Sequence, residues 1–112
     1  MPAFTNGTFL VDTGASSTAV DRGLIAPLGL TATGAVMCHT PTTGQNAVRL
    51  DQYDVMLLVP GVVATQFWMI EAVSITECDL SAQGIQGLIG RDVLDRAMLV
   101  YNGPAKTFTI AY

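Results

Sequence analysis

The tripeptide Asp12-Thr13-Gly14 carries the residue types best suited to chemistry in this sequence. An apolar run at residues 9–11 (Phe-Leu-Val) precedes it and predicts a buried strand that would hold the Asp12 carboxylate rigidly. The Thr13 hydroxyl can bond to neighbouring backbone, and Gly14 permits the close approach of a second backbone or of a substrate. A carboxylate fixed in this way can serve as a general acid or base. Alone, the tripeptide is equally typical of an Asx turn without a function.

A second segment begins at Gly87, about 75 residues further along, and reads Gly-Leu-Ile-Gly-Arg-Asp-Val-Leu. Alone, it predicts only a strand that turns at Gly90 into a helix. Together with residues 9–20 it resembles the retropepsin-like aspartic proteases, which include retroviral enzymes and cellular relatives. That family pairs hydrophobic-hydrophobic-Asp-Thr-Gly-Ala-Ser with Leu-Leu-Gly-x-Asp-x-Leu. The Leu-Gly-Leu at residues 28–30, the loop near Gly44 and the C-terminal hairpin also match cellular members.

The resemblance implies a single domain over residues 1–112 with an all-β fold. The expected architecture is a small closed acid-protease-like barrel with one or two short helices, one lobe per chain, assembled as a homodimer. Two carboxylates would share a proton around one water. One would take a proton from the attacking water, and the other would donate to the scissile carbonyl oxygen. Because the chain has one Asp-Thr-Gly, each subunit would contribute one Asp12 across a two-fold axis, and the Thr13 residues would bond across it.

The resemblance also assigns the remaining site residues of an aspartic endopeptidase. Asp12, Thr13 and Gly14 would be catalytic, and an extended polypeptide would bind as an added β-strand. The matching substrate-binding positions are Leu10, Ala15, Ser16, Thr43, Gly44, Gln86 and Leu88. Residues 41–46 would form a flap that closes over the substrate, although a plain hairpin turn explains them as well. No metal or cofactor is expected.

Two features depart from the retroviral members of the family. Those enzymes carry an acid four residues after the catalytic Asp, and it pairs with the Arg of the second motif. Here that position is Ser16, so Arg91 is expected to bind Asp21 or a carbonyl instead. Only 11 residues precede Asp12, so the hairpin at residues 99–112 is expected to carry the dimer interface.

The elements around these motifs read as short strands separated by turns. Asn6-Gly7 predicts a hairpin, and residues 18–28 predict one short helix. A second helix is expected at residues 92–98, capped by Asp92 with Asp95 completing a capping box. The predicted strands are residues 35–40 and 47–59 (joined across 41–46), 63–73, 85–89, and 99–102 with 106–112 around Asn102-Gly103-Pro104.

Composition excludes several classes of protein. Charged residues make up 12% of the chain and hydrophobic residues 50%, which rules out disorder and predicts an exposed apolar interface or groove. A net charge of −4 without a basic run argues against nucleic acid as a partner. No signal peptide or transmembrane segment is visible, which slightly favours the cytoplasm. One histidine and two cysteines cannot form a zinc site, and Cys38 and Cys78 are expected as reduced, half-buried thiols.

Two rival functions use the same residues. A catalytically silent dimerisation or peptide-binding domain of this fold is the first, although retention of Asp12, Thr13 and Gly14 argues against it. The second is the phosphate loop of actin-like ATPases, which residues 12–17 loosely resemble. That fold needs several hundred residues, so the length of 112 argues against it, and failure to bind ATP would end it.

Overall fold

The computed structural model describes residues 4–38, 47–63 and 65–112, and most of its regular structure is strand. The strands among the described residues are β1 (Phe9–Val11), β2 (Ala19–Asp21), β3 (Gly34–Cys38), β4 (Val48–Pro60), β5 (Phe67–Cys78), β6 (Gly87–Ile89), β7 (Met98–Asn102) and β8 (Thr107–Ala111). The helices are all short: α1 (Arg22–Ile25), η1 (Ala26–Leu28), η2 (Ser81–Gln83) and α2 (Arg91–Leu94). The expected all-β class is therefore confirmed.

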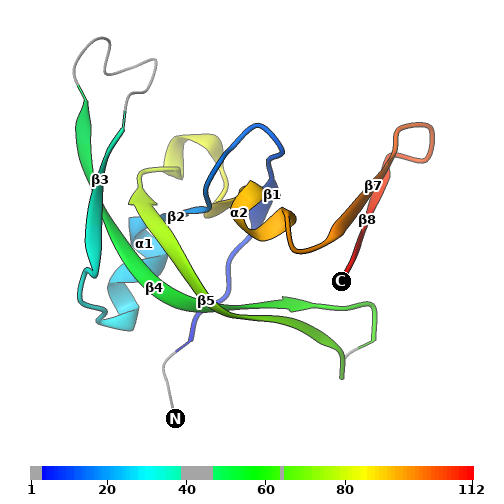
Figure 1. Cartoon of the computed structure of the whole chain (residues 1–112), viewed down its shortest axis with the longest axis horizontal. Coiled ribbons are helices and arrows are strands. Elements are labelled where there is room, and N and C mark those ends of the chain that lie inside the picture. The colour runs from blue at the N-terminus through cyan, green and yellow to red at the C-terminus, as the bar shows by residue number, and fades with distance from the viewer. Residues whose placement is uncertain (1–3, 39–46, 64) are drawn as a thin grey trace.

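Six strands form one sheet in the order β1-β6-β2-β5-β4-β3, and β7 and β8 form a separate hairpin. The long strands β4 and β5 build a curved antiparallel ribbon, whereas β7–β8 projects to one side of the main sheet (Figure 1). Strands β1 and β6 are parallel neighbours although about 75 residues separate them in the chain. Closure of the sheet into a barrel stays a prediction, since the strand order runs from β1 to β3.

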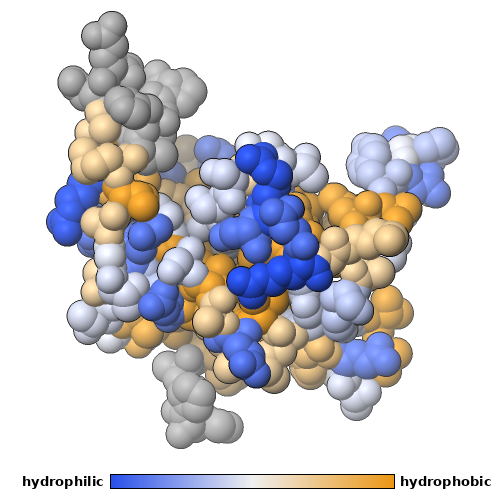
Figure 2. All heavy atoms as spheres, in the orientation of Figure 1, coloured by the Kyte–Doolittle hydropathy of each residue, from blue (hydrophilic) through white to orange (hydrophobic). Residues whose placement is uncertain are grey.

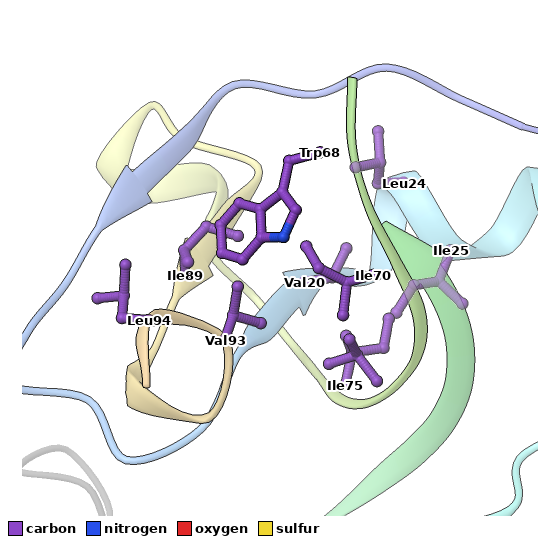
Figure 3. Close-up of a cluster of buried hydrophobic side chains, with 10 residues drawn as sticks. Val20, Leu24, Ile25, Trp68, Ile70, Ile75, Ile89, Val93 and Leu94 are labelled. Atoms are coloured by element: carbon purple, nitrogen blue, oxygen red, sulfur yellow. The ribbon is translucent and has the colours of Figure 1, made fainter. Parts of the chain in front are cut away.

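The core lies where β2, β5 and β6 meet the short helices. Ten side chains form it: Val20, Leu24, Ile25, Trp68, Ile70, Val73, Ile75, Ile89, Val93 and Leu94. Figure 3 shows Ile89, Val93 and Leu94 gathered beside the Trp68 ring, so the helix after β6 is anchored in the same cluster as the ribbon. Burying an aliphatic side chain of this size contributes about 1.5–3 kcal/mol, which fixes the β6–α2 junction firmly.

Several predicted elements are confirmed. Strands β3 and β4 pair antiparallel from Gly34↔Gln52 to Cys38↔Val48, and β6 and the C-terminal hairpin form where they were expected. The strand expected at 63–73 instead runs from Phe67 to Cys78. The expected flap, with Thr43 and Gly44, lies outside the described residues. No helix in the described part of the chain has the length and apolar character needed to cross a membrane.

Three local predictions are wrong. Residues 4–8 are not in a strand, so Asn6-Gly7 makes no hairpin there. A Cβ on Gly7 would lie 2.7 Å from Leu24 Cδ2, and this close packing accounts for the glycine. Residues 19–21 of the predicted helix form β2, because they pair with β5 and β6. Helix α2 spans only Arg91–Leu94, and its N-cap is Gly90 rather than Asp92.

Candidate active site

The Asp12 turn directly follows β1, and its first residue is hydrogen-bonded to β6. Val11 lies opposite Ile89 in the parallel pair, and the Asp12 amide donates to the Ile89 carbonyl at 2.9 Å. Asp12 itself is half-buried, and Thr13 and Gly14 are exposed. The strand pair therefore presents a carboxylate at the surface from a backbone that is held inside the sheet.

Within the turn, the backbone orients the carboxylate. The Gly14 amide donates to Asp12 Oδ1 at 2.9 Å, and the Ala15 amide donates to the Asp12 carbonyl at 3.2 Å. A Cβ on Gly14 would lie 3.2 Å from Asp12 Oδ1, closer than most side chains tolerate. Residues 12–15 thus form a tight turn, and glycine at position 14 keeps the space beside the carboxylate open.

The backbone at Gly90 crosses close to the backbone at Ser17, and this crossing holds the turn in place. A Cβ on Gly90 would lie 2.6 Å from both the Ser17 carbonyl carbon and its oxygen, so only glycine lets the β6–α2 junction pass. Just beyond the crossing, the Arg91 amide donates to the Ala15 carbonyl at 2.8 Å. The loop that carries Asp12 is therefore tied to the second motif on both sides of Gly90.

Arg91 reaches the turn with its side chain as well. Its guanidinium Nη1 donates to the Thr13 carbonyl at 2.9 Å. Of the two partners expected for Arg91, the carbonyl is therefore confirmed and Asp21 is not. Asp21 instead accepts from the amides of Gly23 (2.9 Å) and Leu80 (2.7 Å), so it caps α1 and holds the segment after β5.

A buried clamp between Thr18 and Asp92 completes the support of the turn. Thr18 is 0% exposed, and its hydroxyl donates to Asp92 Oδ1 at 2.7 Å while accepting from the Gly90 amide at 3.1 Å. The Thr18 amide donates to Asp92 Oδ2 at 3.0 Å. Sequence reasoning assigned Asp92 to a helix cap and gave Thr18 no role. The two residues are 74 positions apart, so no local pattern in the sequence indicates their bond.

The structure brings some of the expected substrate-binding residues together. Leu10 and Leu88 are register partners on β1 and β6, and Leu10 is 49% exposed. Ala15 and Ser16 lie in the turn itself. Gln86 has a structural contact, because its Oε1 accepts from the Thr8 amide at 2.9 Å. Thr43 and Gly44 are outside the described residues.

A hollow of about 630 Å³ lies beside the turn. Strand β1 and Thr13 form one wall, and Leu99, Tyr101 and Phe108 of the hairpin form the other. In the described ranges, no three His, Cys, Asp or Glu side chains gather as metal ligands would. Cys78 is half-buried as expected, with its thiol 3.9 Å from the Val20 carbonyl that accepts from it.

Comparison with known families agrees with this arrangement of motifs. A family model described as aspartyl protease matches residues 5–93, which include the Asp12 turn, the Gly90 crossing and the Thr18–Asp92 clamp. Searches of the curated proteins and of the solved structures gave no significant match. The match covers most of the chain, and the protein belongs to the retropepsin-like aspartyl protease family.

Proposed function

We propose that the protein is an aspartic endopeptidase that cleaves extended polypeptides as a homodimer. The observation that carries the proposal is the Asp12 turn: a half-buried carboxylate, oriented by the Gly14 amide, stands at the end of a strand anchored to β6. Family membership supports the same reaction. A merely structural Asx turn would not need the Gly90 crossing, the Arg91 bond and the buried clamp to hold it.

In the proposed mechanism, two Asp12 carboxylates face each other across a two-fold axis and hold one water. With one proton shared between them, the ionised carboxylate takes a proton from the water, which attacks the peptide carbonyl. The protonated carboxyl donates to the carbonyl oxygen, so that a neutral tetrahedral diol forms. The protonated carboxyl then donates its proton to the leaving nitrogen while the other carboxylate takes a proton from a diol hydroxyl, so that the C–N bond breaks, a carboxylic acid and an amine form, and the pair again shares one proton.

The substrate would lie as an extended strand along the exposed side of the turn. The register partners Leu10 and Leu88 would offer apolar contacts, and Ala15 and Ser16 of the turn would contribute the remaining positions. Such walls favour hydrophobic side chains next to the cleaved bond. Thr43 and Gly44, which lie outside the described residues, complete the proposed substrate-binding set.

Asp12→Asn tests the function directly. We expect the variant to lose cleavage of a peptide library by at least about 1,000-fold, because an amide can act neither as the acid nor as the base of the pair. Asp95→Asn, the same change at an exposed carboxylate after α2, should retain full activity. Circular dichroism and light scattering should show an unchanged fold and assembly in both variants.

Two outcomes would overturn the proposal. Wild-type-like cleavage by Asp12→Asn would place the chemistry elsewhere. Pure wild-type protein that binds library peptides without cutting them would instead support a catalytically silent peptide-binding domain of the same fold.

A further inference from the structure

The outer half of the β4–β5 ribbon carries apolar side chains on both of its faces. The sequence has no charged residue from Val55 to Ile70. On one face, Trp68 and Ile70 belong to the core. Their register partners Val59 and Leu57 pack against the core from the same face. The side chains between them point to the opposite face, because side chains alternate along a strand.

We call this opposite side the ribbon's outer face, and its residues are Met56, Leu58, Pro60, Phe67 and Met69. Leu58 lies opposite Met69 and Pro60 lies opposite Phe67, so the residues form two rows along the ribbon. Pro60 is exposed, and the other four residues are each 51% to 54% exposed. Figure 2 shows apolar atoms at the surface where the ribbon ends, at the lower right. A continuous exposed apolar face of this kind is typical of an interaction site.

Neighbouring strands leave this half of the ribbon uncovered within the described residues. Strand β3 pairs with β4 at residues 48–52, and β2 pairs with β5 at residues 76–78. Beyond these pairs the ribbon extends with both edges open in the described sheet (Figure 1). None of the five residues of the outer face lines the hollow beside the Asp12 turn. The face is therefore separate from the candidate active site.

The inner end of the outer face is acidic. Asp54 comes two positions before Met56, and Glu71 comes two positions after Met69, so strand alternation puts both carboxylates on this face. Both acidic residues are exposed, and the Ser74 hydroxyl donates to Asp54 Oδ1 at 2.7 Å. In the described ranges, no Lys or Arg forms an ion pair with Asp54 or Glu71. Two carboxylates thus close one end of an apolar stripe.

This arrangement of charge selects among the surfaces that could cover the face. A second copy would bring its own two carboxylates either against Asp54 and Glu71 or onto the apolar end at Phe67. The first arrangement sets like charges together, and the second buries charges without partners. An anionic membrane surface is repelled by the same carboxylates and by the net charge of −4. A polypeptide segment with apolar and basic side chains matches both ends of the face.

The dimensions of the face fit one helix. Adjacent strands lie about 4.8 Å apart, so two rows with their side chains make a stripe about 10 Å wide, the diameter of a helix. From position 54 to position 60 a strand advances about 20 Å, which is the length of about 13 helical residues. Lys or Arg in the last turn of such a helix also interacts favourably with the helix dipole.

We propose that the ribbon's outer face docks an amphipathic helix of a partner polypeptide, one with an apolar stripe and with Lys or Arg at its C-terminal end. The helix would lie along Leu58, Phe67 and Met69, and its basic side chains would reach Asp54 and Glu71. Docking uses none of the catalytic groups, so this inference does not depend on the proposed function. A polypeptide held there would stay beside the protein while the candidate active site remains open.

Binding of a synthetic helical peptide tests the apolar stripe. The probe is a fluorescein-labelled peptide of about 15 residues, with Leu at helical spacing, Gln between and Lys in the last turn. Fluorescence anisotropy with the full chain as Asp12→Asn, which cannot cut the probe by the proposed mechanism, gives the dissociation constant. We expect Met69→Glu to raise this constant by about tenfold or more, as for a central interface residue. Met98→Glu, the same change at an exposed position of β7, should change it by less than about threefold.

A conservative variant guards against misfolding. Met69→Leu keeps an apolar side chain of similar volume, so it should bind the probe within about threefold of the unsubstituted face. Circular dichroism should show the same fold in all of these proteins.

The acidic end is tested by changing charge on either partner. The Lys peptide should bind about two- to fivefold more tightly than the same peptide with Gln in the last turn, as expected of exposed ion pairs. Glu71→Gln should reduce this preference, whereas Asp95→Asn, a change at an exposed carboxylate after α2, should leave it intact. Added salt should reduce the preference as well.

Three results would overturn the proposal. The first is the absence of saturable binding of the Lys peptide to the folded protein. The second is equal weakening by Met69→Glu and Met98→Glu, or a preference for Lys that Glu71→Gln leaves unchanged, since a specific face must distinguish these variants. The third is self-association, or binding to phosphatidylcholine vesicles, that Met69→Glu abolishes and the Lys peptide does not compete with. That result would assign the face to a second copy or to a membrane.

Failure of the proposed function would give a different result. A protein that binds the Lys peptide through this face as Asp12→Asn, but never cleaves a peptide library as wild type, would refute the endopeptidase and leave the docking face intact.

Discussion

Thr18 shows how much of the site depends on a residue that cannot touch a substrate. Its hydroxyl connects the Asp92 carboxylate to the Gly90 amide, and its own amide donates to the same carboxylate. All of these groups lie at the junction between the two motifs. The position of Asp12 is therefore set by contacts one layer below the turn.

Replacing Thr18 by Val should destabilise the protein by about 2 to 3 kcal/mol, because the buried Gly90 amide and the Asp92 carboxylate each lose a hydrogen-bond partner. Thr18→Ser keeps the hydroxyl and should cost only about 1 kcal/mol for the lost methyl group. Urea unfolding of the three proteins measures the difference. Equal losses in the free energy of unfolding for Thr18→Val and Thr18→Ser would show that packing, and not the hydrogen bonds of the clamp, accounts for the contribution of Thr18.

At the residue scale, the sequence predicted the groups at the surface of the site and missed those beneath it. Asp12, Thr13 and Gly14 could be recognised because they are consecutive. The Thr18–Asp92 bond joins residues 74 positions apart, so no local pattern indicates it. For the same reason Asp92 was assigned to a helix cap, the nearest local role for an acid after a glycine.

At the scale of the elements, the packing of the β6–α2 junction against the loop that carries Asp12 depends most on Gly90. Gly90→Ala would place a methyl group 2.6 Å from the Ser17 carbonyl group, and backbone on both sides cannot give way. We expect a loss of about 2 to 3 kcal/mol in the free energy of unfolding, together with reduced cleavage. Thermal unfolding and the library assay measure both effects.

Gly87→Ala is the matched comparison for that variant. The three atoms nearest to a Cβ on Gly87 all belong to the Phe9 ring, which is the outer part of a half-buried side chain and not backbone. The loss of stability should therefore be smaller than at Gly90. A larger loss at Gly87 than at Gly90 would contradict the importance assigned to the backbone crossing.

The ribbon of β4 and β5 carries a pH-sensitive contact. Burial of Tyr53, together with the nearby negative charge of Glu77, raises the pKa of the Tyr53 hydroxyl above its ordinary value of 10.0. The Tyr53 hydroxyl donates to Glu77 Oε2 at 3.4 Å. The folded protein thus keeps this proton at a pH where the unfolded chain has begun to lose it.

It follows that the contribution of Tyr53 to stability is complete below pH 10 and is lost as the pH rises through the raised pKa. Tyr53→Phe should therefore lose less stability than wild type between about pH 8 and about pH 11 in urea unfolding. Tyr101→Phe, which removes an exposed hydroxyl, is the control. If wild type and Tyr53→Phe lose the same free energy of unfolding at alkaline pH, this contact is not the cause of the loss.

Prediction of the elements succeeded where periodicity and turn residues agree with long-range pairing. The β3–β4 pair and the C-terminal hairpin have both, and both are confirmed. Residues 19–21 were predicted as helix because their apolar spacing is ambiguous, yet pairing with β5 and β6 makes them a strand. Asn6-Gly7 predicts a turn, but in the structure Gly7 instead allows close packing on Leu24.

For the whole molecule, the proposed function requires two chains per catalytic pair. Mixing wild type with a tenfold excess of Asp12→Asn should therefore reduce the wild-type rate to about one-tenth, the share of wild-type chains that pair with each other at random. The rate of peptide cleavage after subunit exchange measures this. An equal excess of an unrelated protein should leave the rate unchanged, and an undiminished rate with Asp12→Asn would mean that one chain suffices.

Because the contacts of the site join residues that are far apart in the sequence, they also determine when during synthesis the site can form. The hydrogen bonds of Gly90, Arg91 and Asp92 to the Asp12 turn and to Thr18 span 72 to 78 positions. During synthesis at the usual 5–20 residues per second, Asp12 therefore leaves the ribosome roughly 4 to 15 s before the residues that secure it. Loop closure over such a distance is also slow in a complete chain. The Asp12 turn of the nascent polypeptide therefore stays without these contacts until residues 90–92 have emerged.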